Sequence, residues 1–392
     1  MFHRSGSAWA ASLAIWFALL GGCGGEAPSD GRAVQPAPVS GGVAATSQVP
    51  AEEKVLHVYN WSDYIAPDTV RRFEVQTGIK VIYDVYDSNE FLETKMLTGK
   101  SGYDIVVPSG RFLERQAKAG VFRTLDKARL PNFKNLDPEI TALLAKHDPA
   151  NAHGVPYMWG TTGIAYNRAK VKSALGSDRV RSWSVVLDPA NAKKLKECGI
   201  AFIDAPAEVI DSALIFLGRD PNSERPEDLA AAENVLMMVR PFVRYFDSSR
   251  YIEDLANGEI CIAIGWSGDA KQAHDRAQEA GTGADIAYAI PKEGSLVWLD
   301  SMAIPADAPH PGNAHAFLNF ILRPDIAAAI SNYTGYPSSN AAAISLIDPS
   351  ITSDPFMFPR GEVRSRLKPQ LASGIEYERL ETRAWQRIQT GQ

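Results

Sequence analysis

The sequence predicts an α/β protein built from two sections, each with a sheet of parallel strands covered by helices. Two observations support this prediction. Strand and helix patterns alternate strictly over residues 55–120 with short connections, and such alternation is typical of parallel sheets. A second alternating section begins after residues 153–167. A chain of 392 residues, 45% of them hydrophobic, is long enough for two such domains.

Each section contains recognisable strands and helices in a regular order. In the first section the predicted strands are 55–60, 79–87 and 103–109. The predicted helices are 67–78, 88–99 and 110–120. Pro67 in the first turn and Gly78 after the end bound the first of these helices. In the second section the predicted strands are 199–206 and 259–269, with amphipathic helices between them.

The N-terminal region has the pattern of an export signal followed by a linker. His3 and Arg4 precede an apolar run over 8–20, which is too short for a good membrane span, and the small residues before Cys23 resemble a lipoprotein cleavage site. We therefore predict a lipoprotein-type signal peptide over 1–23 with a lipid on Cys23; the alternative is an ordinary signal with an incidental cysteine. The segment 24–54 is rich in Gly, Pro and Ala and predicts a disordered tether.

Charge and cysteine content exclude two classes of function. The formal net charge of -6 provides no basic surface for nucleic acid. Besides Cys23 the chain contains only Cys198 and Cys261, and neither has a closely spaced Cys or His neighbour, so no zinc site is predicted. In an oxidising compartment these two thiols most simply form a disulfide, and the alternative is two buried thiols.

Aromatic and polar residues gather at the ends of predicted strands in both sections. In open α/β sheets, ligands bind beyond the carboxyl ends of the strands. The stretch NWSDY, residues 60–64, fills the turn after the first strand. The residues at strand ends are Trp61, Ser62, Asp63, Tyr64, Ser109, Asp204, Glu208, Trp266, Asp269, Trp298, Asp300 and Tyr336. We therefore expect a ligand to bind where these strand ends meet.

Enzyme motifs fail when they are compared residue by residue. The stretch GWSGD, residues 265–269, has Asp269 where a nucleophile elbow needs its closing glycine. Thr94 stands where a phosphate-binding loop ending at Lys100 and Ser101 needs its first glycine. Paired carboxylates leave a hydrolase open as an alternative. Carboxylates beside Trp and Tyr faces fit a cationic amine better, through charge-assisted hydrogen bonds and cation–π attraction.

Five stretches of the sequence resemble the periplasmic polyamine-binding proteins of ABC uptake systems. They are YNWSDYIAPDTV, DIVVPSGRFLERQ, VPYMWGTTGIAYN, LANGEICIAIGW and AIGWSGDA. The resemblance covers the chain from about Val55 to Gln392 and is strongest to the putrescine-binding type. It implies a two-lobed, hinge-linked α/β periplasmic binding protein of type II, with its ligand cleft between the lobes. The implied first lobe is 55–157 with 299–350, and the second is 158–298 with 351–392.

The resemblance also implies roles for individual residues. Glu208 is expected to bind one ammonium end of the ligand, and Asp269 together with Asp300 the other. Cys198 and Cys261 match a pair that is bridged in the family, which supports the disulfide. The implied ligand contacts are Trp61, Ser62, Asp63, Tyr64, Ser109, Glu208, Ser248, Trp266, Asp269, Trp298, Asp300, Tyr336 and Gln370.

The sequence departs from the putrescine-binding pattern at positions that the resemblance connects with ligand choice. Trp298 and Gln370 resemble the spermidine-binding relatives, whereas Ala205 and Asp63 are putrescine-like. Arg111 stands where the family has a small polar residue or a tyrosine. Because a guanidinium repels a cationic ligand, we expect Arg111 to point to solvent or to pair with a carboxylate. The alternative is a ligand that carries an acidic group.

Each candidate residue also has a purely structural interpretation. A tryptophan at a strand end is often part of the core. Ser62 and Asp63 can cap the following helix, and Asp269 and Asp300 can be surface turn residues. The joint position of these residues at strand ends of both sections favours the functional interpretation.

The sequence therefore predicts a solute receptor that is not an enzyme. We expect it to capture putrescine or spermidine and deliver it to an inner-membrane ABC permease with a cytoplasmic ATPase, without a cofactor or metal. We also expect a periplasmic monomer that is lipid-anchored through Cys23. Two alternatives remain open: a receptor that signals to a membrane sensor protein, and a hydrolase of amine conjugates.

Overall fold

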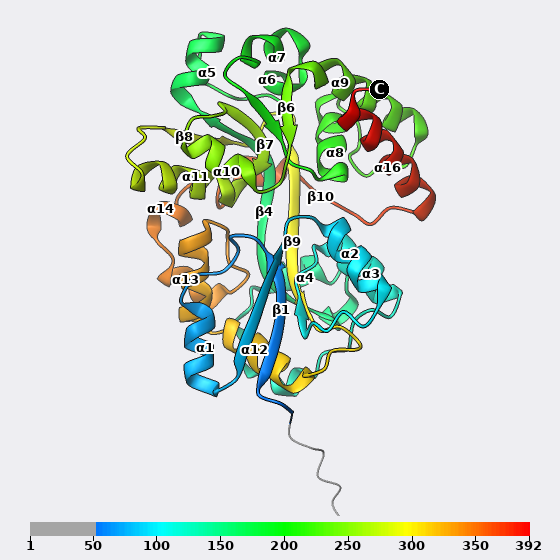
Figure 1. Ribbon diagram of the computed structural model, residues 1–392, viewed down its shortest axis with the longest axis vertical. Coiled ribbons are helices and arrows are strands. Elements are labelled where there is room, and N and C mark those ends of the chain that lie inside the picture. Colours follow the sequence, from blue (N-terminus) through cyan, green and yellow to red (C-terminus); the bar gives the residue numbers. More distant parts are fainter. Residues whose placement is uncertain (1–51) are drawn as a thin grey trace, which may run out of the picture. The chain divides into compact units, whose positions relative to one another are not determined.

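The computed structural model describes residues 52–392, which form a single unit of two α/β lobes (Figure 1). Two long strands, β4 (Gly154–Asn167) and β9 (Ser295–Ala303), pair with each other and run through both lobes. The two-lobed α/β fold predicted from the sequence is confirmed. The predicted signal peptide 1–23, the lipid site at Cys23 and all but the last residues of the predicted tether lie outside the described residues.

The strands of the described part form one mixed sheet in the order β2-β1-β3-β9-β4-β7-β5-β6, with β8 on β4 and β10 on β9. The first-lobe strands are β1 (Val55–Trp61), β2 (Lys80–Tyr86) and β3 (Ile105–Val106). The second-lobe strands are β5 (Ile200–Phe202), β6 (Val243–Phe246), β7 (Ile262–Trp266), β8 (Ile286–Ala289) and β10 (Leu367–Pro369).

The direction of the strands differs from the prediction at the centre of the sheet. The groups β1–β3 and β5–β7 are parallel, as predicted. However, β4 and β9 are antiparallel to each other, and also to β7 and β3 respectively. The prediction of purely parallel sheets was wrong here, because a chain that crosses between lobes and returns must use oppositely directed strands.

Helices cover both faces of this sheet (Figure 1). Those around the first-lobe strands are α1 (Thr69–Thr77), α2 (Asn89–Thr98), α3 (Gly110–Lys118), α4 (Pro138–Leu144), α12 (Pro311–Ile321) and α13 (Pro324–Thr334). Those around the second-lobe strands are α5 (Arg168–Leu175), α6 (Ser184–Leu187), α7 (Pro189–Leu195), α8 (Pro206–Phe216), α9 (Pro226–Val239), α10 (Arg250–Ala256), α11 (Ser267–Glu279) and α16 (Ile375–Thr390). Two short helices are α14 (Pro349–Thr352) and α15 (Gly361–Ser365), and the 3-10 turns are Lys127–Arg129, Pro131–Asn135, Pro149–Asn151, Arg240–Phe242 and Ala341–Leu346. Within residues 52–392, no helix combines the length and apolar character needed to cross a membrane.

The two ends of helix α1 test the sequence signals that were used to predict where it begins and ends. Gly78 ends α1 with a φ of +69° and donates its N–H to the carbonyl of Glu74, as a helix-terminating glycine does. At the other end, α1 begins at Thr69 with Asp68 at the N-cap. Pro67 therefore precedes the helix, and its predicted place in the first turn was wrong.

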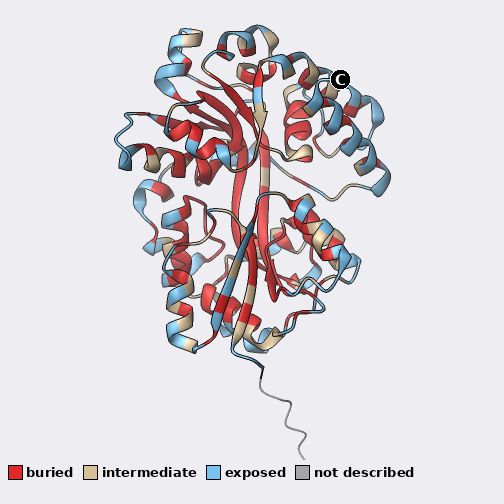
Figure 2. Ribbon diagram, in the orientation of Figure 1, coloured by how far each residue is buried: buried red, intermediate tan, exposed pale blue. Residues whose placement is uncertain are grey.

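Each lobe has its own hydrophobic core. The second-lobe core includes the fully buried Trp183 and Tyr251. In the first lobe, alternate strand residues such as Val58 and Tyr59 belong to separate clusters on the two faces of the sheet. Figure 2 shows that β4 and β9 are buried along their length. The two connecting strands are therefore held on both sides, and the strand ends beside them are fixed in place.

A disulfide links Cys198 and Cys261, whose Cα atoms lie 5.4 Å apart. These residues precede the adjacent parallel strands β5 and β7. The bond closes a loop across 63 residues of chain, which restricts the unfolded state. Of the two arrangements considered for these thiols, the structure has the disulfide.

Candidate functional site

The strand ends of both lobes meet at a pocket with about 480 Å³ of space unoccupied by atoms, part of it open to solvent. All of the predicted ligand contacts except Gln370 line this pocket. Its complete lining is Trp61, Ser62, Asp63, Tyr64, Tyr86, Asp87, Ser109, Glu208, Ser248, Ser249, Ile252, Trp266, Asp269, Trp298, Asp300 and Tyr336. Sequence segments more than 270 residues apart are thus brought to one place by the two connecting strands.

The turn after β1 forms part of the first-lobe wall. Trp61 ends β1, and its indole Nε1 donates to the carbonyl of Val107 at 2.9 Å, which fixes the ring. Asp63 has a φ of +54°, a left-handed conformation that Asp tolerates better than most residues. The Asp63 carboxylate pairs with Arg276 of α11 at 3.0 Å, so this rim contact joins the two lobes.

Asp300 is a buried carboxylate contributed by β9. The Ser109 hydroxyl donates to its Oδ1 at 2.6 Å, and Asn89 holds Ser109 through two hydrogen bonds of 2.9 and 3.1 Å. Burial raises the pKa of Asp300 to about 7, although the Ser109 hydrogen bond lowers it in part. The surroundings of Asp300 therefore stabilise its ionised form only in part, and a cation beside it would favour that form.

Asp269 is the corresponding carboxylate of the second lobe. It lies in the first turn of α11, and its two oxygens accept hydrogen bonds from Tyr251 at 2.7 Å and Tyr336 at 2.6 Å. Burial raises the pKa of Asp269 to about 6, and the hydrogen bonds from the two tyrosines oppose the shift. The two phenols fix the carboxylate orientation and leave its charge in place.

Glu208 is the third carboxylate, in the first turn of α8. Ala205 and Pro206 open that helix directly after β5, which brings Glu208 to the strand end. Its Oε2 accepts a hydrogen bond from the indole of Trp266 at 2.8 Å and another from the hydroxyl of Thr162. Burial raises its pKa as well, against the lowering effect of these two donors.

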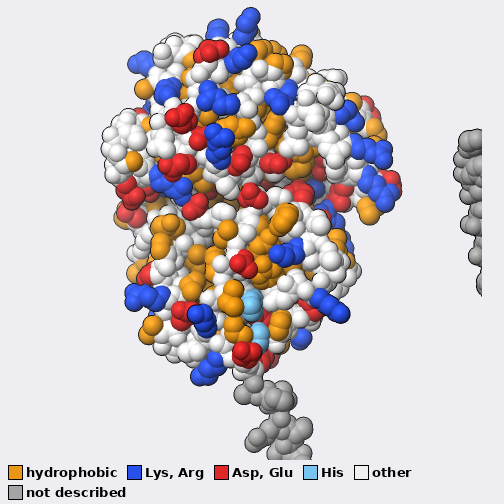
Figure 3. Space-filling view, viewed as in Figure 1, with side chains coloured by type: hydrophobic (Ala, Val, Ile, Leu, Met, Phe, Trp, Pro, Cys, Tyr) orange, Lys and Arg blue, Asp and Glu red, His pale blue; other side chains and the backbone are white. Residues whose placement is uncertain are grey.

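The pocket is electrostatically negative. Its three inner carboxylates, on Glu208, Asp269 and Asp300, are held by hydroxyl and indole donors that carry no net charge. Among the described residues that line the pocket, none is a Lys, Arg or His. Figure 3 shows acidic side chains gathered in a band across the middle of the visible face, with basic residues among them. Such a pocket favours a ligand that brings its own positive charge.

Aromatic rings supply the remaining walls. Trp61 and Trp266, from opposite lobes, meet edge to face with ring centroids 5.7 Å apart. Tyr336 lies 5.3 Å from Trp298 and 5.2 Å from Tyr64, measured between ring centroids. These surfaces can cover a hydrocarbon chain and attract cations to their faces.

Two glycines of the quoted sequence blocks make room for these rings. A Cβ on Gly160 would lie 2.5 Å from Cζ2 of Trp298, and a Cβ on Gly268 would overlap the ring of Tyr336. Gly160 belongs to β4 and Gly268 to α11. Because these two glycines have no side chain, an aromatic ring can lie close to the backbone at each of them. This role was not predicted from the sequence.

The family of bacterial extracellular solute-binding proteins matches residues 68–359. The chain belongs to this family. It is 51% identical to the putrescine-binding periplasmic protein PotF of Escherichia coli K12, over 90% of this chain and 96% of that one. It is 50% identical to the putrescine-binding periplasmic protein SpuD of Pseudomonas aeruginosa, with the same coverage. A solved structure of the spermidine/putrescine ABC transporter substrate-binding protein PotD from Streptococcus pneumoniae is similar, with a TM-score of 0.70, 27% identity, and coverage of 86% of this chain and 99% of that one.

The family resemblance found in the sequence is thus confirmed. Three of the residues predicted to contact or select the ligand nevertheless lie outside the main pocket. Arg111, Ala205 and Gln370 line a neighbouring cavity. The guanidinium of Arg111 lies 3.9 Å from Glu378 and 3.7 Å from Glu381, both on α16. It therefore pairs with carboxylates, as one of the alternatives for this residue foresaw.

Asp204 and Ser248 form a hydrogen bond with each other, but only Ser248 lines the pocket. The carboxylate of Asp204 faces α16, where it accepts hydrogen bonds from Trp385 at 2.9 Å and Gln389 at 2.8 Å, and it does not line the pocket. The Ser248 hydroxyl accepts a hydrogen bond from the backbone N–H of Asp204 at 3.0 Å and does line the pocket. Asp204 therefore has a structural role in anchoring the C-terminal helix.

Four further residues line the ligand pocket but were not predicted from the sequence. Tyr86 and Asp87 lie at and just after the end of β2, so the strand-end rule that selected Asp63 also applies to them. Ser249 and Ile252 lie at the start of α10, where no strand-end pattern marks them. Within the described residues, no group of three His, Cys, Asp or Glu side chains is arranged to hold a metal.

Proposed function

We propose that the protein captures a polyamine, putrescine or spermidine, and delivers it to an inner-membrane ABC permease. The observation that carries this proposal is a pocket that holds three carboxylates, two of them buried and one half-buried, and no basic residue among its described lining residues. The names of the relatives, two putrescine-binding proteins and a spermidine/putrescine transporter component, support the same ligand class.

The chemistry of a diamine suits the two kinds of surface in the pocket. One ammonium binds Glu208, and the other binds Asp269 and Asp300 through charge-assisted hydrogen bonds. The methylene chain between them lies against Trp61 and Trp266, and the remaining rings surround the ammonium groups. A micromolar dissociation constant corresponds to about -8 kcal/mol, which two such ends and a covered chain can provide after the entropic cost of binding.

Closure of the lobes explains how the ligand becomes enclosed. The two lobes, predicted as 55–157 with 299–350 and 158–298 with 351–392, are joined by β4 and β9. The pairing of these strands has an irregularity between Pro156 and Trp159 of β4, which is a natural place for bending. The closed, liganded form docks on the permease, and the transporter then favours the open form for release.

The location follows from the N-terminal sequence and the relatives. The relatives are named as periplasmic proteins. We propose that this chain acts as a periplasmic monomer held to a membrane by a lipid on Cys23, and that its partner permease works with a cytoplasmic ATPase. It requires no cofactor and performs no catalytic step.

Isothermal titration of ligand-stripped protein tests the proposal. The body from Val55 onward is titrated with putrescine, cadaverine, agmatine, spermidine and spermine at one salt concentration. We expect micromolar or tighter binding of at least one amine, and no binding for the variant Asp269→Ala carrying Asp300→Ala. Absence of heat with every amine, from protein shown to be folded by circular dichroism, would refute the proposal.

A further inference from the structure

A second cavity extends the ligand pocket past Glu208. The two spaces share Trp61, Asp87, Glu208 and Trp266 in their linings. The second cavity contains about 310 Å³ of space unoccupied by atoms. A ligand that extends from the main pocket past Glu208 therefore enters a space whose lining includes Arg111.

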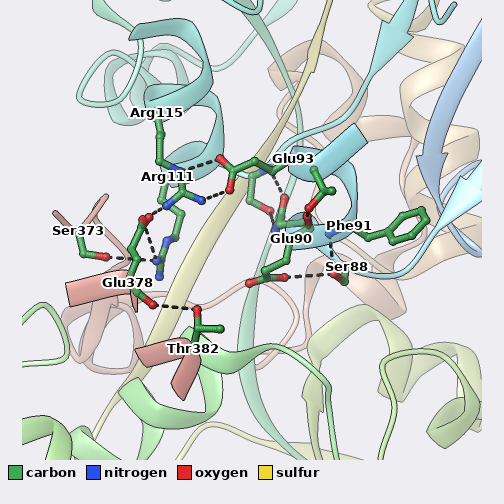
Figure 4. Close-up of polar contacts among 12 residues, drawn as sticks. Ser88, Glu90, Phe91, Glu93, Arg111, Arg115, Ser373, Glu378 and Thr382 are labelled. Carbon is green, nitrogen blue, oxygen red and sulfur yellow. Dashed lines mark hydrogen bonds and ion pairs between the residues drawn. The ribbon is translucent and has the colours of Figure 1, made fainter. Parts of the chain in front are cut away.

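Arg111 lies deep in the contact between the lobes. Its side chain is 6% exposed and reaches from α3 toward the start of α16, where Ser373 and Glu378 lie 3.3 and 3.9 Å from its Nη2 (Figure 4). Glu381 of α16 lies 3.7 Å from the same nitrogen. A third cavity lies beyond it and is lined in part by Asp211 and Glu381. Among the described residues, Arg111 is the only one that lines both this space and the second cavity. The guanidinium thus separates the two spaces.

The carboxylates around this guanidinium depend on its charge. Burial raises the pKa of Glu208, Asp211 and Glu381, and the positive charge of Arg111 acts in the opposite direction on each. Gln370, the other polar residue of interest here, donates to Asp211 at 2.9 Å. Asp211 and Glu381 are therefore already served by one internal cation and one amide, whereas Glu90, which lines the second cavity, accepts a hydrogen bond from the Ser88 hydroxyl at 3.2 Å.

We propose that Arg111 is an internal cation that occupies the place of a third amine and makes the pocket select diamines over triamines. The inference rests on the proposed polyamine function. A diamine ends at Glu208 and does not meet the guanidinium. A triamine of the spermidine type carries its extra ammonium past Glu208 toward Arg111, where like charges repel and Glu378 and Glu381 are already paired with the guanidinium.

This role is a matter of charge, and an analogue that lacks only the third ammonium separates charge from chain length. N-propylputrescine is spermidine without its terminal amino group, so it is shorter by one atom and carries one positive charge fewer. If Arg111 acts by repulsion, wild-type protein will bind N-propylputrescine at least about tenfold more tightly than spermidine. If the cavity is simply too small, the two molecules will bind equally weakly.

The matched variants are Arg111→Gln, Arg111→Lys and Arg115→Gln. Arg115 is on the same helix and contacts the same Glu378, but it does not line the second cavity (Figure 4). Titrations with putrescine and spermidine should show that Arg111→Gln raises the affinity for spermidine relative to putrescine by about tenfold or more. Arg111→Lys and Arg115→Gln should keep the wild-type ratio.

Several results would overturn the role of Arg111 while leaving polyamine capture intact. They are equal wild-type affinities for putrescine and spermidine, an unchanged ratio in Arg111→Gln, or equally weak binding of spermidine and N-propylputrescine. If Arg111→Gln fails to fold, the wild-type comparison of spermidine with N-propylputrescine decides by itself. Failure of the wild-type protein to bind any amine would instead refute the proposed function, and this inference with it.

Discussion

Buried carboxylates occur in two regions of this protein, and the two regions compensate their charge differently. In the ligand pocket, Asp269 and Asp300 are 6% and 4% exposed and accept hydrogen bonds from Tyr and Ser hydroxyls. At the contact between α3 and α16, Glu381 is also 6% exposed, but its neighbour is a guanidinium. Carboxylates that are equally buried thus have uncharged hydrogen-bond donors as neighbours in the pocket, and a positively charged guanidinium at the contact between α3 and α16.

The difference shows where an external cation is needed. A neutral donor orients a carboxylate and stabilises its ionised form only in part, so the cost of burying the charge remains. An arginine at the contact offsets part of that cost within the chain itself, although burial still raises the pKa of Glu381. Arg115 extends the same pattern, because it binds Glu93 at 2.7 Å and also contacts Glu378. The pocket is therefore the region that a polyamine completes.

Lowering the pH should have the largest effect, because it removes the charge from the pocket carboxylates. With pKa values of about 7 for Asp300 and about 6 for Asp269, both groups are largely ionised at pH 8 and largely protonated at pH 5. Alkylamines stay charged throughout this range. We expect the affinity for putrescine to fall by about 1,000-fold from pH 8 to pH 5, as measured by titration calorimetry. Constant affinity over this range would show that these carboxylates do not bind the amine.

The same raised pKa values also predict the stability of the unliganded protein. Between about pH 4, where an ordinary Asp ionises, and pH 7, the folded state holds protons on Asp269 and Asp300 that the unfolded chain has lost. The free energy of unfolding should therefore fall as the pH rises through this window. Saturating putrescine should abolish this slope, because it holds both carboxylates ionised, and thermal melts with and without ligand can measure the difference.

Removal of one pocket charge should have the next largest effect. Asp300→Asn keeps the shape of the side chain but leaves one ammonium with Asp269 as its only carboxylate partner, so putrescine affinity should fall by about 100-fold, at the lower end of the 2–5 kcal/mol typical of buried charge pairs. Glu378→Gln is the matched control from the contact between α3 and α16, and it should change putrescine affinity by less than about threefold. A similar loss in both variants would remove the distinction between the two regions.

Substitution of Trp266 should have an intermediate effect, because this residue both forms a wall and donates to Glu208. Trp266→Leu removes the aromatic face and the hydrogen bond, and we expect putrescine affinity to fall by about 10- to 30-fold. Trp266→Phe keeps an aromatic face and should lose about half of that free energy. If both variants bind like the wild type, the ring does not contact the ligand.

Local sequence signals predicted two α/β sections and most of the pocket lining, because each predicted strand end carries its own polar or aromatic residues. Asp269 and Asp300 were found in this way although 31 residues separate them. The arrangement of these sections as two lobes was implied by the family resemblance. The partners that hold these carboxylates were not found. Tyr251 lies inside a helix and Thr162 inside a strand, and their contacts depend on how the two lobes pack. The antiparallel crossing of β4 and β9 was missed for a similar reason, since strand direction is a property of the whole chain path.

The smallest effect concerns Trp298. Among the described residues, its indole Nε1 has no hydrogen-bond partner, whereas the hydroxyl of Tyr64 lies close enough to Asp300 to lower the pKa of that carboxyl. A tyrosine oxygen can accept a hydrogen bond from an ammonium, but an indole N–H can only donate, and its positive end is unfavourable beside a cation. Trp298→Phe removes this donor and keeps a ring against Gly160 and Tyr336, so putrescine affinity should rise by about threefold relative to spermidine. An unchanged ratio in parallel titrations would show that ligand choice does not depend on this position, and a lower putrescine affinity would mean that the indole contributes as a cation–π surface.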